Sequence, residues 1–247
     1  MAKYIDLIGW DDAPHLQPPN ITQEELDDLE STLLPHQRQA RRTGKPALGS
    51  GAIYPVDEDD LLVDPFRIPP DWPRSYALDV GWQKTAAIWG AHDVDNDCYY
   101  LVHEYYVGQQ EPIIHARAIK AVSEWMMGAI DPASVGSNQK DGSKLKQEYR
   151  GEGLKLVNAN NAVNAGIHRA LVLMQSGRLR VFRTLTNWRK EFRLYRRDEK
   201  GRIVKENDHL MDSMRYLLNT DGIWRTKPVE RVRGGSRGEW GGRRSSH

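Results

Sequence analysis

The sequence predicts an α/β fold, a mixed sheet flanked by helices. Apolar and β-branched runs of strand length recur from residue 76 onward. The first three runs are separated by short turns, which predicts an antiparallel meander, and the later runs alternate with helical segments, which is typical of parallel strands. With 247 residues, of which 39% are hydrophobic, the chain is long enough to bury one sizeable core.

The three strands of the predicted meander cover Tyr76–Val80, Thr85–His92 and Tyr99–Val107. Between them lie the turn sequences Gly81–Lys84 and Asp93–Asp97. A helix follows from Pro112 to about Met127, because proline is favourable in the first turn of a helix. Its buried side is predicted to comprise Ile113, Ala116, Ile119, Ala121, Val122 and Trp125.

Strands and helices then alternate to the end of the domain. A short strand ends at Ile130–Asp131, where Pro132 stops it. The following elements are predicted as a helix near 143–150, a strand near 154–157, a helix near 163–176, a strand near 179–182, a helix near 185–195 and a basic hairpin over 196–206. The last helix begins near Asp208, ends before Asp221 and buries Met211, Met214, Leu217 and Leu218.

The chain is predicted to have three parts. Residues 1–70 form an irregular, proline-rich lead-in with one short helix, which begins at Thr22, runs to about Leu33 and has Glu25 at the capping-box position. Residues 71–224 form the α/β domain. Residues 225–247, rich in Gly, Arg and Ser, are predicted to be a disordered basic tail, because so few core-forming residues cannot offset the entropy lost on ordering.

Composition excludes several classes of protein. Cys98 is the single cysteine, so a disulfide framework and a cysteine-ligated zinc or iron–sulfur site are excluded, and a reducing compartment is expected. No secretory leader or apolar run of membrane-spanning length is present, which predicts a soluble intracellular protein. Any metal must then be held by oxygen ligands.

Charge is distributed unevenly although the net charge is only +1. Residues 1–175 carry 16 Lys+Arg and 25 Asp+Glu, whereas residues 176–247 carry 19 and 9. This asymmetry predicts a basic surface for a polyanion attached to an acidic body.

Two carboxylates lie at strand ends. Asp79 lies within an apolar strand, where an ionised carboxylate needs an arginine, backbone donors or a metal ion to neutralise it. Asp131 follows the strand that ends at Ile130. A partnered structural Asp79 and a simple turn residue at 131 are the alternatives. Because the carboxyl ends of neighbouring parallel strands meet at one crevice, Asp79 and Asp131 can nevertheless lie together.

Two further carboxylates, Asp208 and Asp212, are four residues apart on one helical face beside the buried methionine stripe. Asp208 alone is also explained as a helix cap. A cluster of three or four carboxylates without Cys or His is typical of Mg²⁺ or Mn²⁺, and two such ions can catalyse phosphodiester hydrolysis. Glu104 is a weaker candidate for the edge of this site.

Other chemistries lack their motifs. The chain has no G-x-x-x-x-G-K-[ST] phosphate loop, because Gly44–Lys45 is followed by Pro46. It also has no G-x-G-x-x-G loop, no G-x-S-x-G elbow and no H-E-x-x-H helix. Cys98, within a strand, is a poor candidate for a nucleophile.

A series of motifs along the chain matches a known family. The motifs are Trp10–Leu16 (WDDAPHL), Pro35–Arg38 (PHQR), Leu48–Pro55 (LGSGAIYP), Tyr76–Trp82 (YALDVGW) and Asp208–Tyr216 (DHLMDSMRY). In this order they resemble the large terminase subunit of tailed double-stranded DNA bacteriophages, over roughly residues 8–224. The resemblance implies an RNase H-like (RuvC-like) nuclease that cuts concatemeric viral DNA in the host cytoplasm.

The resemblance also implies roles for individual residues. Asp79, Asp131 and Asp212 correspond to the family's metal-binding carboxylates, with Asp208 beside them, and they would bind two Mg²⁺ or Mn²⁺ ions. The hairpin over 196–206 resembles the family's hairpin near the active site. Implied partners are double-stranded DNA, the portal and the small terminase subunit. The family's ATPase motor has no counterpart in this sequence, so either the motor is a separate chain or this is the nuclease half alone.

Basic residues near the hairpin are the predicted DNA contacts: Arg193, Arg196, Arg197, Lys200, Arg202 and Lys205. Contacts to the phosphate backbone carry no sequence information, so cleavage should be non-specific and sensitive to salt. A solvated basic face without a ligand is the alternative. For the whole chain, the alternatives are a junction resolvase or transposase-like nuclease of the same fold, and a non-catalytic module that binds DNA or the portal.

Overall fold

The computed structural model describes residues 13, 20–31, 51–131 and 139–228. Seven strands form one mixed sheet in the order β1-β7-β4-β3-β2-β5-β6. The strands are β1 (Leu62–Val63), β2 (Arg74–Val80), β3 (Thr85–Asp93), β4 (Cys98–Val107), β5 (Met127–Ile130), β6 (Lys155–Asn158) and β7 (Leu179–Phe182). The antiparallel meander β2–β3–β4 is confirmed, and every other pairing in the sheet is parallel.

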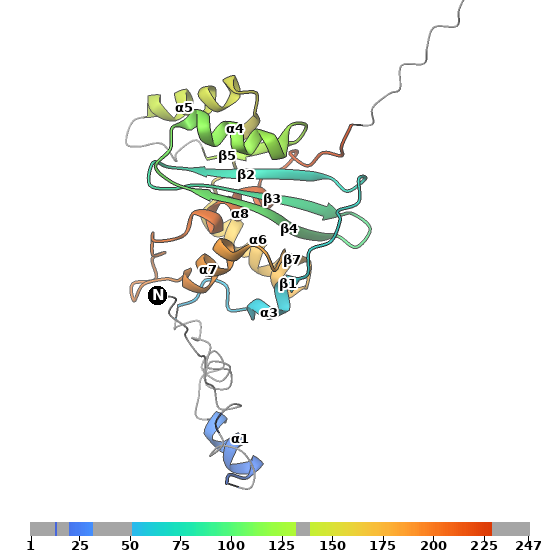
Figure 1. Ribbon diagram of the computed structural model, residues 1–247. Coiled ribbons are helices and arrows are strands. Elements are labelled where there is room, and N and C mark those ends of the chain that lie inside the picture. The colour runs from blue at the N-terminus through green and yellow to red at the C-terminus, as the bar shows by residue number, and fades with distance from the viewer. Residues whose placement is uncertain (1–12, 14–19, 32–50, 132–138, 229–247) are drawn as a thin grey trace, which may run out of the picture.

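Helices cover both faces of the sheet (Figure 1). On one face lie α4 (Pro112–Ser123) and α5 (Gln139–Gly151), and on the other lie α6 (Val163–Gln175), α7 (Thr186–Leu194) and α8 (His209–Asn219). Helix α8 packs directly on β2 and β3, with α6 and α7 against its other sides. Because it is enclosed in this way, every residue from Leu210 to Asn219 is buried.

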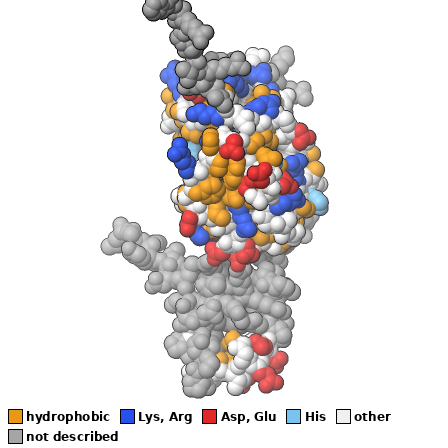
Figure 2. All heavy atoms as spheres, turned by 90° about the vertical axis from the view of Figure 1, so that its right-hand side faces the viewer, with side chains coloured by type: hydrophobic (Ala, Val, Ile, Leu, Met, Phe, Trp, Pro, Cys, Tyr) orange, Lys and Arg blue, Asp and Glu red, His pale blue; other side chains and the backbone are white. Residues whose placement is uncertain are grey.

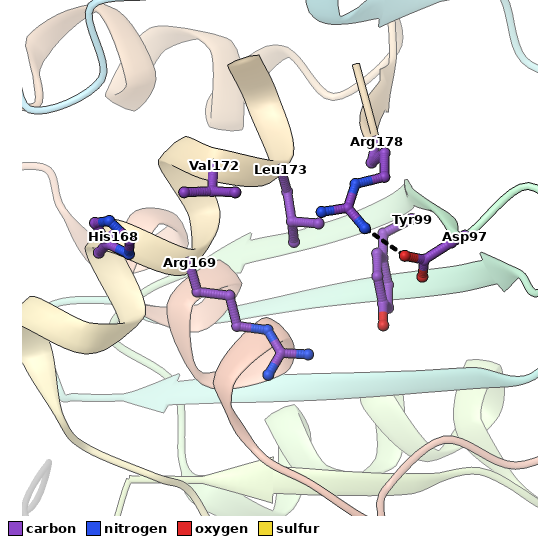
Figure 3. Close-up of a pocket in the computed structure, with 7 residues that line it drawn as sticks. All are labelled: Asp97, Tyr99, His168, Arg169, Val172, Leu173 and Arg178. Atoms are coloured by element: carbon purple, nitrogen blue, oxygen red, sulfur yellow. Dashed lines mark hydrogen bonds and ion pairs between the residues drawn. The ribbon is translucent and has the colours of Figure 1, made fainter. Parts of the chain in front are cut away.

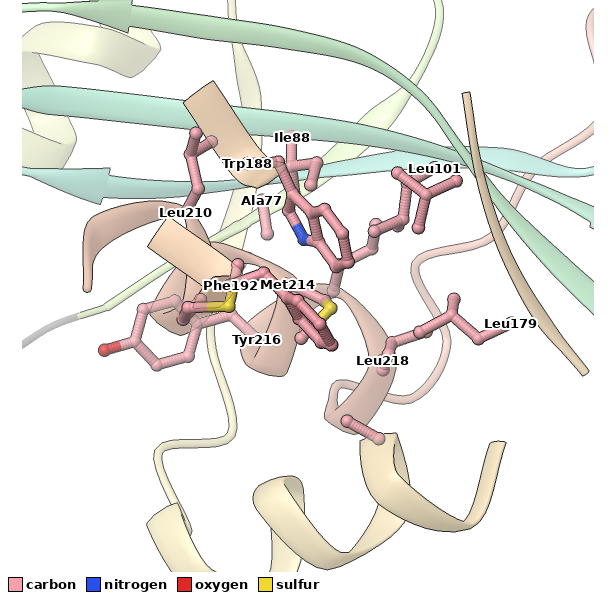
Figure 4. Close-up of a cluster of buried hydrophobic side chains, with 14 of the residues drawn as sticks. Ala77, Ile88, Leu101, Leu179, Trp188, Phe192, Leu210, Met214, Tyr216 and Leu218 are labelled. Carbon is pink, nitrogen blue, oxygen red and sulfur yellow. The ribbon is translucent and has the colours of Figure 1, made fainter. Parts of the chain in front are cut away.

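Two apolar clusters hold these layers together. The larger lies between the sheet and the helices α6, α7 and α8, and Trp188, Phe192, Met214 and Tyr216 are among its members (Figure 4). The smaller lies between the sheet and the helices α4 and α5, with Tyr76 and Trp89 on the strands and Tyr149 on α5. Alternate residues of β2 therefore serve opposite cores, as the two-residue repeat of a strand requires.

The first part of the chain contributes more to the body than the sequence analysis predicts. Helix α3 (Glu58–Leu61) and strand β1 lie within the segment 1–70, and Ile53, Tyr54 and Leu61 are buried in the larger core. The packed body thus begins before residue 70. Tyr54 stacks on Phe192, a contact between residues far apart in sequence that proline content could not reveal.

The capping box of helix α1 (Gln23–Ser31) is confirmed. The backbone N–H of Thr22 donates to Glu25 at 2.9 Å, and the backbone N–H of Glu25 donates to the Thr22 hydroxyl at 3.3 Å. The predicted continuation to Leu33 lies outside the described residues, as do the motifs at 10–12, 14–16, 35–38 and 48–50 and the tail beyond residue 228. The predicted start of the disordered tail at residue 225 is wrong, because Arg225 forms an antiparallel bridge with Arg74.

Helix α4 is shorter than predicted and buries a different face from the one that the sequence analysis predicts. It ends at Ser123, and Met127 begins β5. Ala116 and Ile119 are buried as expected, but Ile113 and Val122 are exposed. His115 and Ser123 are buried instead, because each has a hydrogen-bond partner. The partner of His115 is the Tyr105 hydroxyl, and the partner of Ser123 is the indole N–H of Trp89.

The two ends of the sheet carry different connections. At one end lie the β2–β3 turn and the N-terminus of α8, and at the other lies the β3–β4 turn. Figure 2 is a view of the end that lies on the right in Figure 1. Hydrophobic side chains gather in the middle of this surface, with acidic and basic side chains around them. Among the described residues, no helix is long and apolar enough to cross a membrane.

Candidate active site

Asp79 and Asp131 lie at equivalent positions on neighbouring parallel strands. In the register of β2 and β5, Leu78 pairs with Ile130, and the next residues along the two chains are Asp79 and Asp131. The predicted convergence of these two carboxylates at one sheet edge is therefore seen in the structure. Asp131 is buried and Asp79 is half-buried.

Helix α8 adds Asp208 and Asp212 to the same edge. Asp208 occupies the N-cap position, but its side chain makes no capping hydrogen bond, and Asp212 lies one turn further on. Both are buried. Burial raises the pKa of Asp79, the contact with His209 acts against that increase, and the charges of Asp212 and Asp208 are near enough to add to it because the helix packs on β2 and β3.

Cationic side chains neutralise the pair on α8. Lys205 Nζ, from the hairpin, lies 3.0 Å from Asp208 Oδ2 and 3.1 Å from Asp212 Oδ2. Arg215, buried on α8, places Nη2 3.0 Å from Asp212 Oδ1. Asp212 is thus held from two sides, since one oxygen faces the lysine and the other faces the arginine.

The other two carboxylates have partners of their own. His209 Nδ1 lies 2.8 Å from Asp79 Oδ2, and this contact raises the pKa of the imidazole. The Tyr216 hydroxyl donates to Asp131 Oδ2 at 2.7 Å, and the Asn161 amide donates to Asp131 Oδ1 at 3.3 Å. These partners fix the orientation of both strand-end carboxylates.

A continuous series of contacts joins the two halves of the site. Arg215 Nη1 donates to Asn161 Oδ1 at 3.3 Å, so Asn161 contacts both Asp131 and the arginine that pairs with Asp212. The side chain of Arg215 packs against the backbone of Gly166 in α6. A Cβ at position 166 would lie only 2.4 Å from Arg215 Cγ, which is too close for two carbon atoms that are not bonded. Glycine at position 166 thus allows α6 to approach this network.

Glu191 is a buried acidic residue that the sequence analysis missed. Its Oε2 accepts a hydrogen bond of 2.6 Å from the backbone N–H of Leu210, in the first turn of α8. Burial raises the pKa of Glu191, while the Tyr106 hydroxyl, the Leu210 N–H and His209 act against that increase. Its spacing of three from Trp188, a core residue, was the available signal for burial.

The donor chemistry of the site suits a hard divalent cation, since four carboxylates gather there without a thiolate. As the side chains stand, no three His, Cys, Asp or Glu residues in the described part of the chain are grouped closely enough to enclose an ion. Lys205 lies between Asp208 and Asp212, and His209 covers Asp79. The residues therefore fit Mg²⁺ or Mn²⁺ in chemistry, while Lys205 and His209 contact carboxylate oxygens of the same group.

The predicted DNA contacts are partly engaged within the protein. Arg193 forms an ion pair with Glu58, Arg202 pairs with Asp198, and Lys205 binds the site carboxylates. Arg197 donates to the carbonyl of Gly201, within the predicted hairpin, where Arg197 and Ile203 form an antiparallel bridge. The predicted cluster therefore carries less uncompensated charge than its sequence implies.

Glu104 is a structural residue. Its carboxylate accepts hydrogen bonds from the backbone N–H groups of Asn187 at 2.9 Å and Trp188 at 2.8 Å, at the beginning of α7. It satisfies donors that the helix itself leaves free. Cys98 is buried, in agreement with its exclusion as a nucleophile.

Figure 3 shows a surface hollow of about 440 Å³ whose lining includes none of Asp79, Asp131, Asp208 and Asp212. It is lined by Asp97, Tyr99, His168, Arg169, Val172, Leu173 and Arg178, none of which is a predicted site residue. Arg178 is paired with Asp97 there.

Comparison with known proteins identifies the family. The family model described as "Terminase RNaseH-like domain" matches residues 71–220. The large terminase subunit of Salmonella phage P22 is 31% identical over 205 residues, which cover 79% of this chain and 41% of that protein. The chain therefore spans about two fifths of the length of this curated relative.

Solved structures agree with this match. The P22 large terminase nuclease domain is 30% identical, with a TM-score of 0.66 over 73% of this chain and 97% of that chain. The large terminase nuclease of thermophilic phage G20c, crystallised with bound magnesium, is 16% identical, with a TM-score of 0.52 over 70% of this chain and 98% of that chain; this likeness shows the fold alone. The predicted RNase H-like fold is confirmed, and the chain belongs to the terminase RNaseH-like domain family.

Proposed function

We propose that this chain is a metal-dependent endonuclease that cleaves concatemeric double-stranded viral DNA during packaging in the host cell. The observation that carries the proposal is the placement of Asp79 and Asp131 side by side through the β2–β5 register, with α8 bringing Asp208 and Asp212 to the same edge. Membership of the terminase family supports the choice of DNA as substrate.

In this proposal Asp79, Asp131 and Asp212 hold two Mg²⁺ or Mn²⁺ ions, with Asp208 beside them. Bound ions of this kind supply activation of a water and charge stabilisation at the leaving oxygen. The chain's own contribution is orientation. Arg215 holds one oxygen of Asp212, and Tyr216 and Asn161 hold Asp131, so the protein's own side chains orient these two carboxylates.

The basic hairpin is proposed to lie along the DNA backbone. Arg196, Arg197, Lys200 and Arg202 belong to it, and phosphate contacts from such residues give affinity without sequence preference. The motor, the portal and the small terminase subunit are the further partners that we propose for the packaging complex. Positioning of the DNA by the motor would raise the local substrate concentration at this site.

The test is cleavage of supercoiled plasmid by the purified protein in Mn²⁺ or Mg²⁺. Asp79→Asn, Asp131→Asn and Asp212→Asn should each abolish cleavage, and EDTA should abolish it in the wild type. Asp221→Asn is the matched control, because the Asp221 side chain is 95% exposed beyond the end of α8. Its activity should equal that of the wild type.

Four outcomes would contradict the proposal. Cleavage that survives EDTA, or an Asp79→Asn protein that cuts normally, excludes the metal site. A strong preference for four-way junctions over linear duplex indicates a resolvase. If neither the Asp variants nor added metal change the amount of DNA that is cleaved, and Mn²⁺ leaves the melting temperature unchanged, the carboxylates are structural and the chain is a binding module.

A further inference from the structure

We propose that the β2–β3 turn is a DNA-contact site, in which Lys84 binds a backbone phosphate beside the scissile bond and Trp82 packs against the adjoining nucleotide. The inference rests on the proposed function, because it describes how the same site holds its substrate. Neither residue belongs to the basic cluster around the hairpin, and neither is a carboxylate of the metal site.

The turn is held rigidly beside the site. The backbone N–H of Gln109 donates to the Trp82 carbonyl at 2.8 Å, and the Thr85 hydroxyl donates to the Gly81 carbonyl at 3.2 Å. A Cβ at Gly108 would lie 2.0 Å from the carbonyl oxygen of Gln83. The backbone of the β2–β3 turn therefore packs directly against the backbone of the segment that follows β4. Trp82, three residues after Asp79, is thus presented from a fixed backbone.

Trp82 is unusually exposed for its type. Its exposed fraction is 61%, the largest among the big hydrophobic side chains in the described part of the chain. A tryptophan that is left in water on a rigid turn loses the free energy that burial of its ring would supply. Stacking on nucleotides recovers this free energy without sequence preference, because every base presents a flat π-face.

Lys84 lies on the face of the sheet that carries the carboxylates. Ala86 pairs with Asp79 on the neighbouring strand β2 and with Tyr106 on the neighbouring strand β4, so all three side chains point to the same face. Lys84 is two residues before Ala86, which is the spacing of residues on one face of a strand. The Nζ of Lys84 lies 4.5 Å from the centre of the Tyr106 ring, and that ring also faces His209 at 6.4 Å between centroids. The cation–π contact holds the ammonium toward the site.

The charge of Lys84 is available to a ligand. Among the described residues, no carboxylate forms an ion pair with it, in contrast to Lys205 and Arg193. A cation on the edge of a cluster of carboxylates can hold a phosphate that those carboxylates would otherwise repel. The pairing of an oriented cation with an exposed aromatic ring is the chemistry that binds a nucleic-acid strand.

The experiment measures binding and cleavage separately. Binding of a fluorescent duplex is followed by anisotropy in EDTA over a series of salt concentrations, and cleavage is followed in Mn²⁺ with varied DNA. Trp82→Ala should weaken binding about fivefold or more with an unchanged salt slope, and Trp82→Phe should restore most of it. Lys84→Gln should reduce the slope of log K against log salt by about one.

Both variants should raise KM while kcat at saturating DNA stays within about twofold of the wild type, because neither side chain is a metal ligand. The controls are Val94→Ala, an exposed apolar residue of the β3–β4 turn at the other end of the sheet, and Lys155→Gln, an exposed lysine at the beginning of β6. Both controls should bind as the wild type does.

The inference is overturned if Trp82→Ala and Lys84→Gln bind and cut like the wild type, or if the two controls lose as much affinity as they do. Failure of the proposed function looks different, because an Asp79→Asn protein would then cut as well as the wild type whatever the result at Trp82. Circular dichroism and melting temperatures of all variants separate loss of contact from loss of fold.

Discussion

Lys205 Nζ lies 3.1 Å from Asp212 Oδ2, and so a hairpin residue that was predicted to contact DNA instead neutralises a predicted metal ligand. Because the same ammonium lies 3.0 Å from Asp208 Oδ2, it stands between two carboxylates in the position that a bound cation would favour. Burial opposes the charge of this lysine, but the two carboxylates dominate and raise its pKa. The hairpin and the two carboxylates are therefore coupled through one side chain.

The first prediction concerns this coupling. Lys205→Met keeps an unbranched side chain, one atom shorter, and removes its charge, so Asp208 and Asp212 should repel one another and the metal-free protein should melt at a lower temperature. Added Mn²⁺ should then raise the melting temperature more than it does in the wild type, because no ammonium competes for the carboxylates. Equal Mn²⁺-induced shifts in the two proteins would contradict this prediction. Lys200→Met, a matched change in the hairpin turn, is the control.

The second prediction concerns the hydroxyl that orients Asp131. Tyr216→Phe removes the 2.7 Å hydrogen bond to a buried carboxylate and should lower the free energy of unfolding by about 1–3 kcal/mol, measured by urea denaturation. It should also lower kcat several-fold with little change in KM. Tyr105→Phe is the control, because it loses a 2.8 Å hydrogen bond to His115 on the opposite face of the sheet. If both variants lose kcat equally, Tyr216 has no positioning role.

The third prediction concerns the close approach of α6 to Arg215. Alanine normally stabilises a helix by roughly 1 kcal/mol relative to glycine. At Gly166 the added Cβ would overlap Arg215 Cγ, so Gly166→Ala should instead destabilise by about 1–3 kcal/mol and displace the guanidinium from Asp212. Gly151→Ala, at the end of α5 with no heavy atom within 4 Å of the new Cβ, should be neutral or stabilising in the same thermal unfolding assay.

The fourth prediction concerns the pH dependence of stability. The pKa of Glu191 is raised in the folded protein by burial, so the folded state retains a proton that the unfolded state has already lost. As pH rises from about 4 through the folded pKa, wild type should lose stability relative to Glu191→Gln, whose amide oxygen can still accept the Leu210 N–H. Denaturant titrations of both proteins at a series of pH values isolate this group, since other carboxylates titrate in both. The prediction is contradicted if the free energies of unfolding of wild type and Glu191→Gln differ by the same amount at every pH.

Much of the architecture could be predicted because it depends on local patterns. The strands of the meander, the strand Leu179–Phe182 and the capping box at Thr22 follow from alternation, turn sequences and side-chain hydrogen bonding within a few residues. The carboxylates stood out for a related reason, since Asp79 in an apolar strand and Asp212 beside a buried stripe conflict with their surroundings unless a partner is present.

Helix α4 shows where local patterns are insufficient. Its apolar residues Ile113 and Val122 were predicted to be buried, yet Ser123 and His115 are buried in their place. Each polar side chain gains a hydrogen bond from a residue on the sheet, Trp89 or Tyr105, which offsets its desolvation. The packing of the sheet therefore chooses which face of the helix is buried.

The sequence by itself determined the fold class, the order of the strands in the meander and the candidate carboxylates, because periodicity and residue type act over short distances along the chain. Only the tertiary structure decided how those carboxylates are arranged and which side chains contact them. The β2–β5 register places Asp131 beside Asp79, and the packing of α8 sets Lys205, Arg215 and His209 against them. Glu104 and Glu191, with the same chemistry, bind helix N-termini instead. These contacts join residues up to 130 positions apart, and their geometry depends on packing that no local pattern encodes.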